Sequence, residues 1–193
     1  MEWTWAYRLW QAPVAERKLA PVLAHNDLRS VRRVLDVGCG PGTNTHHFRH
    51  ADYLGIDINP AYIASARRRH GRPFVVADVT TYTVQDDRRF DFIFVNSFLH
   101  HVDTASAERV LQHLHSLLTE DGHVHIIDLV LPAHRSIARF LARMDRGDFP
   151  RPLEEWRRLF SSHYEPVVFE PYALSAFDVP LWSLVYFKGR ARR

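Results

Sequence analysis

The chain has one cysteine among its 193 residues, Cys39, so no disulfide can form within it. Such a composition is typical of a reducing compartment, and we expect a cytoplasmic protein. No apolar run reaches the ~18 residues that a membrane span needs, and we expect no secretory signal at the start. Internal repeats and low-complexity segments are lacking as well. The sequence therefore predicts neither a disulfide-rich scaffold, nor a membrane span, nor a repeat array.

The net charge is only +3 with neutral histidines, and the basic residues occur in short groups. Nucleic-acid binding calls for basic residues interleaved with exposed aromatic residues along one surface. The groups here stand instead at the expected ends of helices and strands, so we expect no nucleic-acid partner. The length fits one domain whose core buries ~70% of the surface of the unfolded chain.

The most informative stretch is residues 34–42, which read Val-Leu-Asp-Val-Gly-Cys-Gly-Pro-Gly. The apolar run at its start predicts a buried parallel strand. The alternate glycines that follow allow a sharp turn and leave no Cβ atom between the main chain and a ligand. A helix expected over residues 43–48 would point its free N–H groups at an anion. The stretch predicts a cradle for a small anionic or zwitterionic cofactor, although a plain Gly-rich turn is the alternative.

Further along the chain, strands alternate with helices between residues 33 and 131. Because strands that alternate with helices form parallel sheets with right-handed crossovers, we expect an α/β fold. The N-terminal residues 2–26 predict one or two helices, and residues 133–163 predict two more. The apolar runs predict strands at residues 34–37, 53–57, 74–77, 90–96, 123–131, 166–172 and 181–188, and the main crossover helices are expected at 60–70 and 104–118.

Acidic residues end two of these strands. Asp57 lies nineteen residues beyond Gly38, where open parallel sheets place an acid that binds a ribose diol. Asp78 ends the third strand, and the fourth is followed by Asn-Ser-Phe-Leu-His-His at residues 96–101. The glycine spacing disfavours a nicotinamide dehydrogenase, because Thr43 stands where the third glycine of a dinucleotide loop would be.

In this order, the glycine loop, the two acids and the residues 96–101 resemble class I S-adenosylmethionine (AdoMet)-dependent methyltransferases. The resemblance covers about residues 33–131. It implies a three-layer α/β/α, Rossmann-like fold with a seven-stranded, mostly parallel sheet whose last strand is antiparallel. It also implies AdoMet as the cofactor, held by Asp36, Gly38, Gly40, Gly42, Asp57, Ile58, Asp78, Val79 and Asn96.

The resemblance further implies one domain with four parts. Residues 1–30 would form a helical cap, 31–132 the AdoMet-binding core, 133–165 a helical insertion that covers the substrate, and 166–193 a pair of strands. The cap is rich in tryptophan, so it could pack over the domain, lie on a membrane surface or close over the cofactor as a lid. The sequence does not identify the acceptor, the pathway or the oligomeric state.

The expected function is methyl transfer from AdoMet to oxygen, nitrogen or carbon of a small molecule. His100 and His101 are the candidate proton acceptors, because an ordinary histidine has a pKa of ~6.5. Adjacent residues point in different directions, so at most one would face the substrate, and we favour His101. The alternative is that neither is catalytic, one packing under the sheet and the other touching the cofactor through its backbone.

Two further functions compete with a small-molecule methyltransferase. One is a non-catalytic AdoMet-binding partner or sensor, which the sequence does not exclude. The other is a nucleic-acid N-methyltransferase, which usually carries N/D-P-P-Y/F after strand four, whereas this chain has Asn-Ser-Phe-Leu there. A metal site is not expected, because the pairs His46/His50 and His123/His125 lack a third ligand nearby in sequence.

Overall fold

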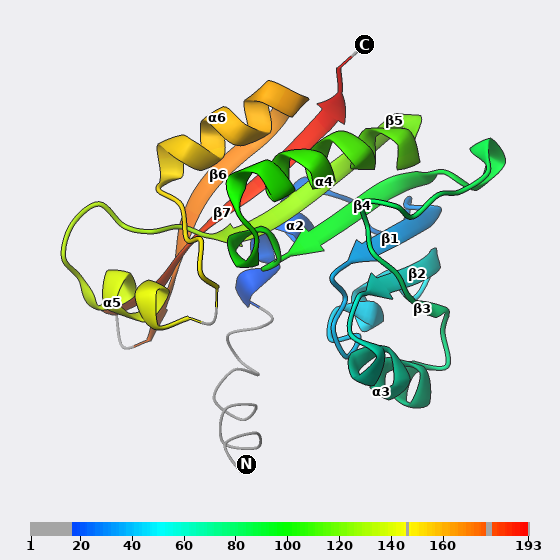
Figure 1. Ribbon diagram of the computed structural model, residues 1–193, viewed down its shortest axis with the longest axis horizontal. Coiled ribbons are helices and arrows are strands. Elements are labelled where there is room, and N and C mark those ends of the chain that lie inside the picture. Colours follow the sequence, from blue (N-terminus) through cyan, green and yellow to red (C-terminus); the bar gives the residue numbers. More distant parts are fainter. Residues whose placement is uncertain (1–16, 146, 177–178, 193) are drawn as a thin grey trace.

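The computed structural model describes residues 17–145, 147–176 and 179–192. They form one seven-stranded sheet with the strand order β3-β2-β1-β4-β5-β7-β6 (Figure 1). Strands β1 to β5 are parallel, and β7 is antiparallel to both of its neighbours. This confirms the predicted fold class. The strands are β1 (Arg33–Val37), β2 (Asp52–Asp57), β3 (Phe74–Val76), β4 (Phe90–Asn96), β5 (Leu118–Leu129), β6 (Tyr164–Ala176) and β7 (Val179–Ala191).

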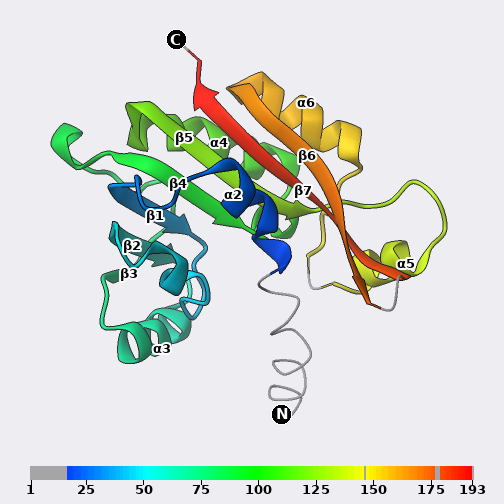
Figure 2. The same ribbon diagram turned by 180° about the vertical axis from the view of Figure 1, so that it is seen from behind.

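Helices cover both faces of the sheet. The helices α4 (Thr104–Leu117) and α6 (Leu153–His163) lie on one face (Figure 1). On the other face lie α2 (Ala20–His25), α3 (Pro60–His70) and α5 (Ile137–Met144), with α5 near the far end of β6 and β7 (Figure 2). No helix in the described part of the chain is long and apolar enough to cross a membrane.

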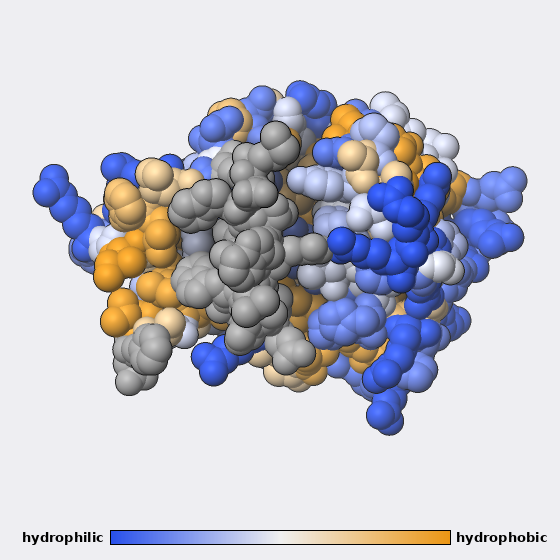
Figure 3. All heavy atoms as spheres, turned by 90° about the horizontal axis from the view of Figure 1, so that it is seen from below, coloured by the Kyte–Doolittle hydropathy of each residue, from blue (hydrophilic) through white to orange (hydrophobic). Residues whose placement is uncertain are grey.

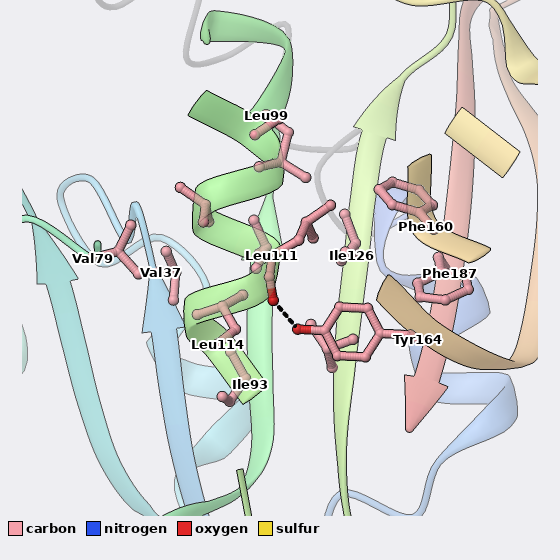
Figure 4. Close-up of a cluster of buried hydrophobic side chains, with 14 of the residues drawn as sticks. Val37, Val79, Ile93, Leu99, Leu111, Leu114, Ile126, Phe160, Tyr164 and Phe187 are labelled. Atoms are coloured by element: carbon pink, nitrogen blue, oxygen red, sulfur yellow. Dashed lines mark hydrogen bonds between the residues drawn. The ribbon is translucent and has the colours of Figure 1, made fainter. Parts of the chain in front are cut away.

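The apolar run of β4 is explained by burial on both faces. Ile93 packs into the cluster beneath α4 and α6, whereas its neighbour Phe92 packs into the cluster on the opposite face. Figure 4 shows the first cluster, in which Leu111 of α4 lies beside the Tyr164 ring. The Tyr164 hydroxyl donates a hydrogen bond of 2.7 Å to the Leu111 carbonyl, so this buried phenol is satisfied. Two-sided burial of this kind is typical of parallel sheets.

The predicted helix over residues 43–48 is wrong in type. Residues 45–48 form a short 3-10 turn (Thr45–Phe48, η1). Only residues 38–51 join β1 to β2, and the glycine loop takes up the first part of this segment. Too little chain remains for a regular α-helix, so the predicted helix N-terminus for an anion is not formed.

The strand pair at the end of the chain is longer than predicted. The pairing of β5 with β7 ends at Leu184, and beyond it β6 and β7 pair only with each other. The helix α5 leaves Ile137, Phe140 and Met144 54%, 63% and 68% exposed. Figure 3 shows hydrophobic surface at this end of the molecule. Of the helices predicted over residues 2–26, the described part contains α2 (Ala20–His25), whereas the tryptophan-rich part falls on residues 1–16, outside the described residues.

Candidate active site

The glycine loop after β1 forms one wall of a cleft at the end of the sheet. Gly38 and Gly40 have φ angles of 64° and 54°, in the left-handed region that favours glycine. A Cβ atom at Gly38 would lie 3.0 Å from the ring of Phe98, which follows β4. A side chain at this position would therefore force the loop and the end of β4 apart.

Asp57 and Asp78 stand at neighbouring strand ends, as predicted. Asp57 Oδ2 accepts a hydrogen bond of 2.9 Å from the Gly40 N–H, and its Oδ1 accepts one of 2.8 Å from the Asn59 N–H. Asp78 Oδ1 accepts bonds of 2.8 Å from both the N–H and the hydroxyl of Thr80. These bonds lower the pKa of Asp78, which keeps its carboxylate ionised at neutral pH. Both acids can accept hydrogen bonds from a nucleoside.

The glycine loop and these strand ends enclose a cleft of about 620 Å³. Residues from the ends of β1 to β4 and from the start of α4 line it. Among the predicted cofactor residues, the lining includes Gly38, Gly40, Asp57, Ile58, Asp78 and Val79. The lining residues that were not predicted include Tyr62, Thr80, Ser97, Phe98, Ser106 and Arg109.

Three predicted cofactor residues, Asp36, Gly42 and Asn96, are not part of this lining. Side chains alternate along a strand, so Val37 faces the cleft and Asp36 faces the opposite layer. Asp36 is 1% exposed, and its Oδ2 accepts a bond of 2.8 Å from the Tyr53 hydroxyl. Burial raises the pKa of Asp36 to about 7, although the Tyr53 bond opposes this effect. The side chain of Asp36 thus lies in the layer opposite the cleft, bonded to Tyr53 of β2, and its cofactor role stays an untested prediction.

The two candidate histidines have different surroundings. Both belong to the short 3-10 turn Leu99–His101 (η3) after β4. His101 is exposed and lines the cleft. His100 is 3% exposed, and its Nδ1 lies 2.6 Å from Oδ1 of Asp128 in β5. Of the two, His101 is the one that a ligand in the cleft can reach.

The surroundings of His100 favour its charged form. Burial alone would lower the pKa of His100, but the bond to Asp128 and the charges of Asp128 and Asp145 raise it to about 9. Asp145 Oδ1 lies 3.6 Å from His100 Nε2. Asp128 also accepts hydrogen bonds from the N–H groups of Leu99 (2.8 Å) and Leu129 (2.7 Å). The raised pKa favours the imidazolium form of His100, and the ring lies outside the cleft lining, so the role of proton acceptor stays a prediction for His101.

Arg151 fixes the turn that carries the histidines. Its guanidinium donates hydrogen bonds to the carbonyl oxygens of Leu99 (2.9 Å) and Val102 (2.8 Å) and lies over the Trp156 ring, 4.8 Å from the centroid. The Phe149 N–H donates to the His100 carbonyl (3.0 Å). Arg151 lies far along the chain from η3, and no sequence pattern indicated that it would hold this turn.

Lys18 also lies in this region, although no sequence pattern predicted its position there. The residue is partly buried, and its ammonium donates a hydrogen bond to the Ser97 hydroxyl. Burial lowers the pKa of Lys18, while the more distant charges of Asp128 and Asp145 oppose this. The N-terminal segment therefore places a cation beside a residue that lines the cleft.

Within the described part of the chain, one group of side chains has donor atoms close enough together to hold a metal ion. His100, His101 and Asp145 each offer a donor atom, and these lie within 4.8 Å of one another. The two histidine pairs considered from sequence are not part of this group. His100 Nδ1 lies 2.6 Å from Asp128 Oδ1, and its raised pKa favours a charged ring, which would disfavour a cation at this group.

Chelation tests the expectation of a metal-free site. Prolonged dialysis of the protein against EDTA should leave ligand binding and thermal stability unchanged, because Asp128 and a proton already satisfy His100. Differential scanning calorimetry before and after dialysis would measure the thermal stability. A fall in the melting temperature that added Zn²⁺ reverses would contradict this expectation and would identify the group as a metal site.

The comparisons with known proteins agree with this architecture. Residues 34–122 match the model of a family described as "Methyltransferase domain". The trans-aconitate 2-methyltransferase of Methylobacterium radiotolerans is 34% identical over 127 residues, which make up 62% of this chain and 47% of the relative. The enzyme of the same name from Escherichia coli strain SE11 is 32% identical over 126 residues, 63% of this chain and 48% of the relative. The chain thus spans about half the length of these relatives.

Solved structures extend the similarity in fold to nearly the whole chain. The N-methyltransferase NodS of Bradyrhizobium japonicum gives a TM-score of 0.70 at 17% identity, over 93% of this chain and 98% of that one. A 1,6-didemethyltoxoflavin-N1-methyltransferase of Burkholderia thailandensis gives 0.70 at 23% identity, over 97% of this chain and 83% of that one. With the glycine loop, the two strand-end acids and the strand order, these matches show that the chain has the Rossmann-like methyltransferase fold and that its residues 34–122 are similar to the methyltransferase-domain family.

Proposed function

We propose that this chain is an enzyme that transfers a methyl group from AdoMet to a small-molecule acceptor. The observation that carries the proposal is the single cleft in which the glycine loop, Asp57, Asp78 and His101 meet. The glycine loop allows a zwitterionic ligand to approach the backbone closely, and Asp57 and Asp78 offer two carboxylates that can accept hydrogen bonds from its nucleoside. His101 adds a group able to take a proton within the same cleft.

In this proposal, each group of cofactor residues binds a different part of AdoMet. The N–H and C=O groups of the Gly38–Gly42 backbone bind the amino-acid part, Asp57 accepts hydrogen bonds from the ribose hydroxyls, and Asp78 accepts one from the adenine amino group. Val79 packs against the adenine ring. The orphan Oδ1 of Asn96, buried and without a hydrogen-bond partner among the described residues, supports a ligand group near the end of β4.

The chemistry demands little more than alignment and removal of a proton. Bound AdoMet would supply an electrophilic methyl carbon: the acceptor would form a bond to this carbon as its bond to the sulfonium sulfur breaks, and S-adenosylhomocysteine would leave. Holding the two reactants in line is worth ~7–11 kcal/mol in well-oriented intramolecular reactions. His101 takes the proton from an acceptor hydroxyl or protonated amine. Phe149 and Arg151, which contact η3, would help to shield the acceptor from water, the role expected of residues 133–165.

Because the similar proteins of Methylobacterium radiotolerans and Escherichia coli are trans-aconitate 2-methyltransferases, trans-aconitate is the first acceptor to test. Protein saturated with methyl-labelled AdoMet would be incubated with trans-aconitate and a panel of other small acids, alcohols and amines. Mass spectrometry would then detect labelled products. Transfer to any member of the panel or to an extracted small molecule supports the proposal. Calorimetric binding of AdoMet without any transfer would instead favour the non-catalytic binding protein.

Replacing Asp57 with alanine tests the proposed cofactor site. The change should weaken AdoMet binding by roughly 1.5–3 kcal/mol, the usual effect of losing a charged hydrogen-bond partner. Isothermal titration calorimetry would measure this, with Asp52→Ala as a control. Asp52 begins the same strand, but its carboxylate is 62% exposed, pairs with Arg33 and lies outside the cleft. Equal AdoMet affinity of D57A and D52A would show that the ribose is held elsewhere.

A further inference from the structure

Lys18 places a positive charge at the end of β4 through a well-anchored backbone. The carbonyl of Lys18 accepts a hydrogen bond of 2.7 Å from the Tyr172 hydroxyl of β6. The next residue, Leu19, is 2% exposed within the core beneath α2. Because the backbone is held from both directions, the fold itself brings the Lys18 ammonium to the Ser97 hydroxyl.

Ser97 connects this ammonium to the cleft. Its φ angle of 53° makes it the one non-glycine residue with positive φ among those that the structure describes. Its N–H donates a hydrogen bond of 2.8 Å to the Ile127 carbonyl of β5, which fixes this backbone. Backbone of this kind is costly for serine, and such residues cluster at functional sites. Ser97 lines the same cleft as His101.

Among the residues that the structure describes, the ammonium of Lys18 forms no ion pair. Across residues 17–145, 147–176 and 179–192, the hydrogen bond of its Nζ goes to the neutral Ser97 hydroxyl, and no carboxylate lies within ion-pair distance. Asp128 is engaged by His100 and two backbone N–H groups, and Asp145 lies against His100. A lysine ammonium has three donors, and burying it without an anion is unfavourable.

We propose that Lys18 and Ser97 form a subsite for an anionic group, a carboxylate or a phosphate, of the methyl acceptor; this rests on the proposed methyltransferase function. The anion would accept hydrogen bonds from the Lys18 ammonium and the Ser97 hydroxyl. This anionic group would bind the acceptor to the protein. It need not contain the atom that receives the methyl group.

The position in the sheet favours the acceptor over the carboxylate of the cofactor. The acids proposed to hold the nucleoside lie at the ends of these strands: Asp57 is the last residue of β2, and Asp78 follows β3. The acids that act on Lys18 are Asp128 in β5 and Asp145 beyond it. Since β1 and β4 separate these two groups of acids in the sheet, Lys18 lies on the side away from the nucleoside.

The experiment compares four proteins: wild type, Lys18→Met, Lys18→Arg and Arg17→Met. Each would be incubated with methyl-labelled AdoMet and a small-molecule extract, and the labelled products would be separated by anion exchange. Prior phosphatase treatment of the extract distinguishes a phosphate from a carboxylate. Arg17→Met is the matched control, because it removes one charge from the adjacent residue, which lines a separate groove against β6.

We expect the wild-type acceptor to be retained by the anion exchanger before methylation. K18M should lower kcat/KM for it by about 30-fold or more, the effect of losing a partner of a buried charge. The loss should fall mainly on KM, K18R should recover much of it, and R17M should match the wild type. The Kd of AdoMet and the melting temperature should stay close to the wild-type values in every variant.

Three results would overturn the inference. Wild-type labelling of only neutral or cationic acceptors is one, and unchanged kinetics in K18M is another. The third is a rise in the Kd of AdoMet in K18M with an unchanged acceptor KM, which would assign Lys18 to the carboxylate of the cofactor. In each case the proposed function stands. Wild-type protein that binds AdoMet but labels nothing would refute the proposed function and the acceptor subsite with it.

Discussion

Replacing His101 with alanine should lower kcat by ~10²–10⁴ when the methylated atom is a protonated oxygen or nitrogen, the usual contribution of a general base. Among the described residues, His101 is the histidine that lines the cleft. Asp128 is fully buried and engaged by His100 and two N–H groups. The Kd of AdoMet should change little. Steady-state kinetics combined with calorimetry would measure both quantities.

The pH profile and a matched control make this result specific. In the wild type, turnover should fall at acidic pH, where a base becomes protonated, and H101A should lose this lower limb. His134→Ala is the control, because His134 is exposed between β5 and α5 and lies outside the cleft lining. Wild-type turnover in H101A would mean that the acceptor atom needs no proton removed, as with an ionised carboxylate or a carbon nucleophile.

The fold was predictable from the sequence because its signals are local. A buried strand reads as an apolar run, as in Phe90–Asn96, and the start and end of α3 are marked by Asn59, Pro60 and Gly71. Asn59 caps the helix by accepting a hydrogen bond from the Ala61 N–H, and Gly71 ends it with a φ of 57°. The strand-end acids followed from the same logic, since parallel strands bring their carboxyl ends to one edge.

The part of the site beyond β4 depended on distant contacts that no local pattern encodes. The sequence placed two histidines side by side, but only the packing against Asp128 shows which one turns inward. Lys18 reaches Ser97 across 79 positions of the chain, and Arg151 reaches Leu99 across 52. Neither cation belongs to a recognisable motif. The residues beyond β4 are thus brought together by tertiary contacts, whereas the glycine loop and the strand-end acids each lie within a short segment of the sequence.

The contrast between the two histidines also explains how one turn can serve structure and chemistry together. His100 joins β4 to β5 through Asp128, and Arg151 holds the carbonyl oxygens on both sides of the turn. These bonds leave the turn little freedom, so the side chain of His101 is presented to the cleft from a fixed base. A proton acceptor held in this way is pre-oriented, which is where alignment contributes most to rate.

Replacing Asp128 with alanine should therefore lower the free energy of unfolding by ~3–5 kcal/mol, because it leaves a buried cation unpaired. The Leu99 and Leu129 N–H groups would also lose their acceptor. Chemical denaturation monitored by circular dichroism would measure the loss. Asp121→Ala is the control in the same strand, since Asp121 is exposed and should change stability by less than about 0.5 kcal/mol.

The pH dependence of Asp128→Asn separates the charge from the hydrogen bonds, because the asparagine keeps the shape and still accepts an N–H. In the wild type the pKa of His100 is raised to about 9, against ~6.5 in an unfolded chain. The stabilisation by this pair is therefore complete below pH ~6.5 and is lost as the pH rises through 9. The difference in unfolding free energy between wild type and D128N should be largest near pH 6 and shrink steadily toward pH ~9.5. A difference that stays constant over this range would mean that His100 is neutral in the folded protein.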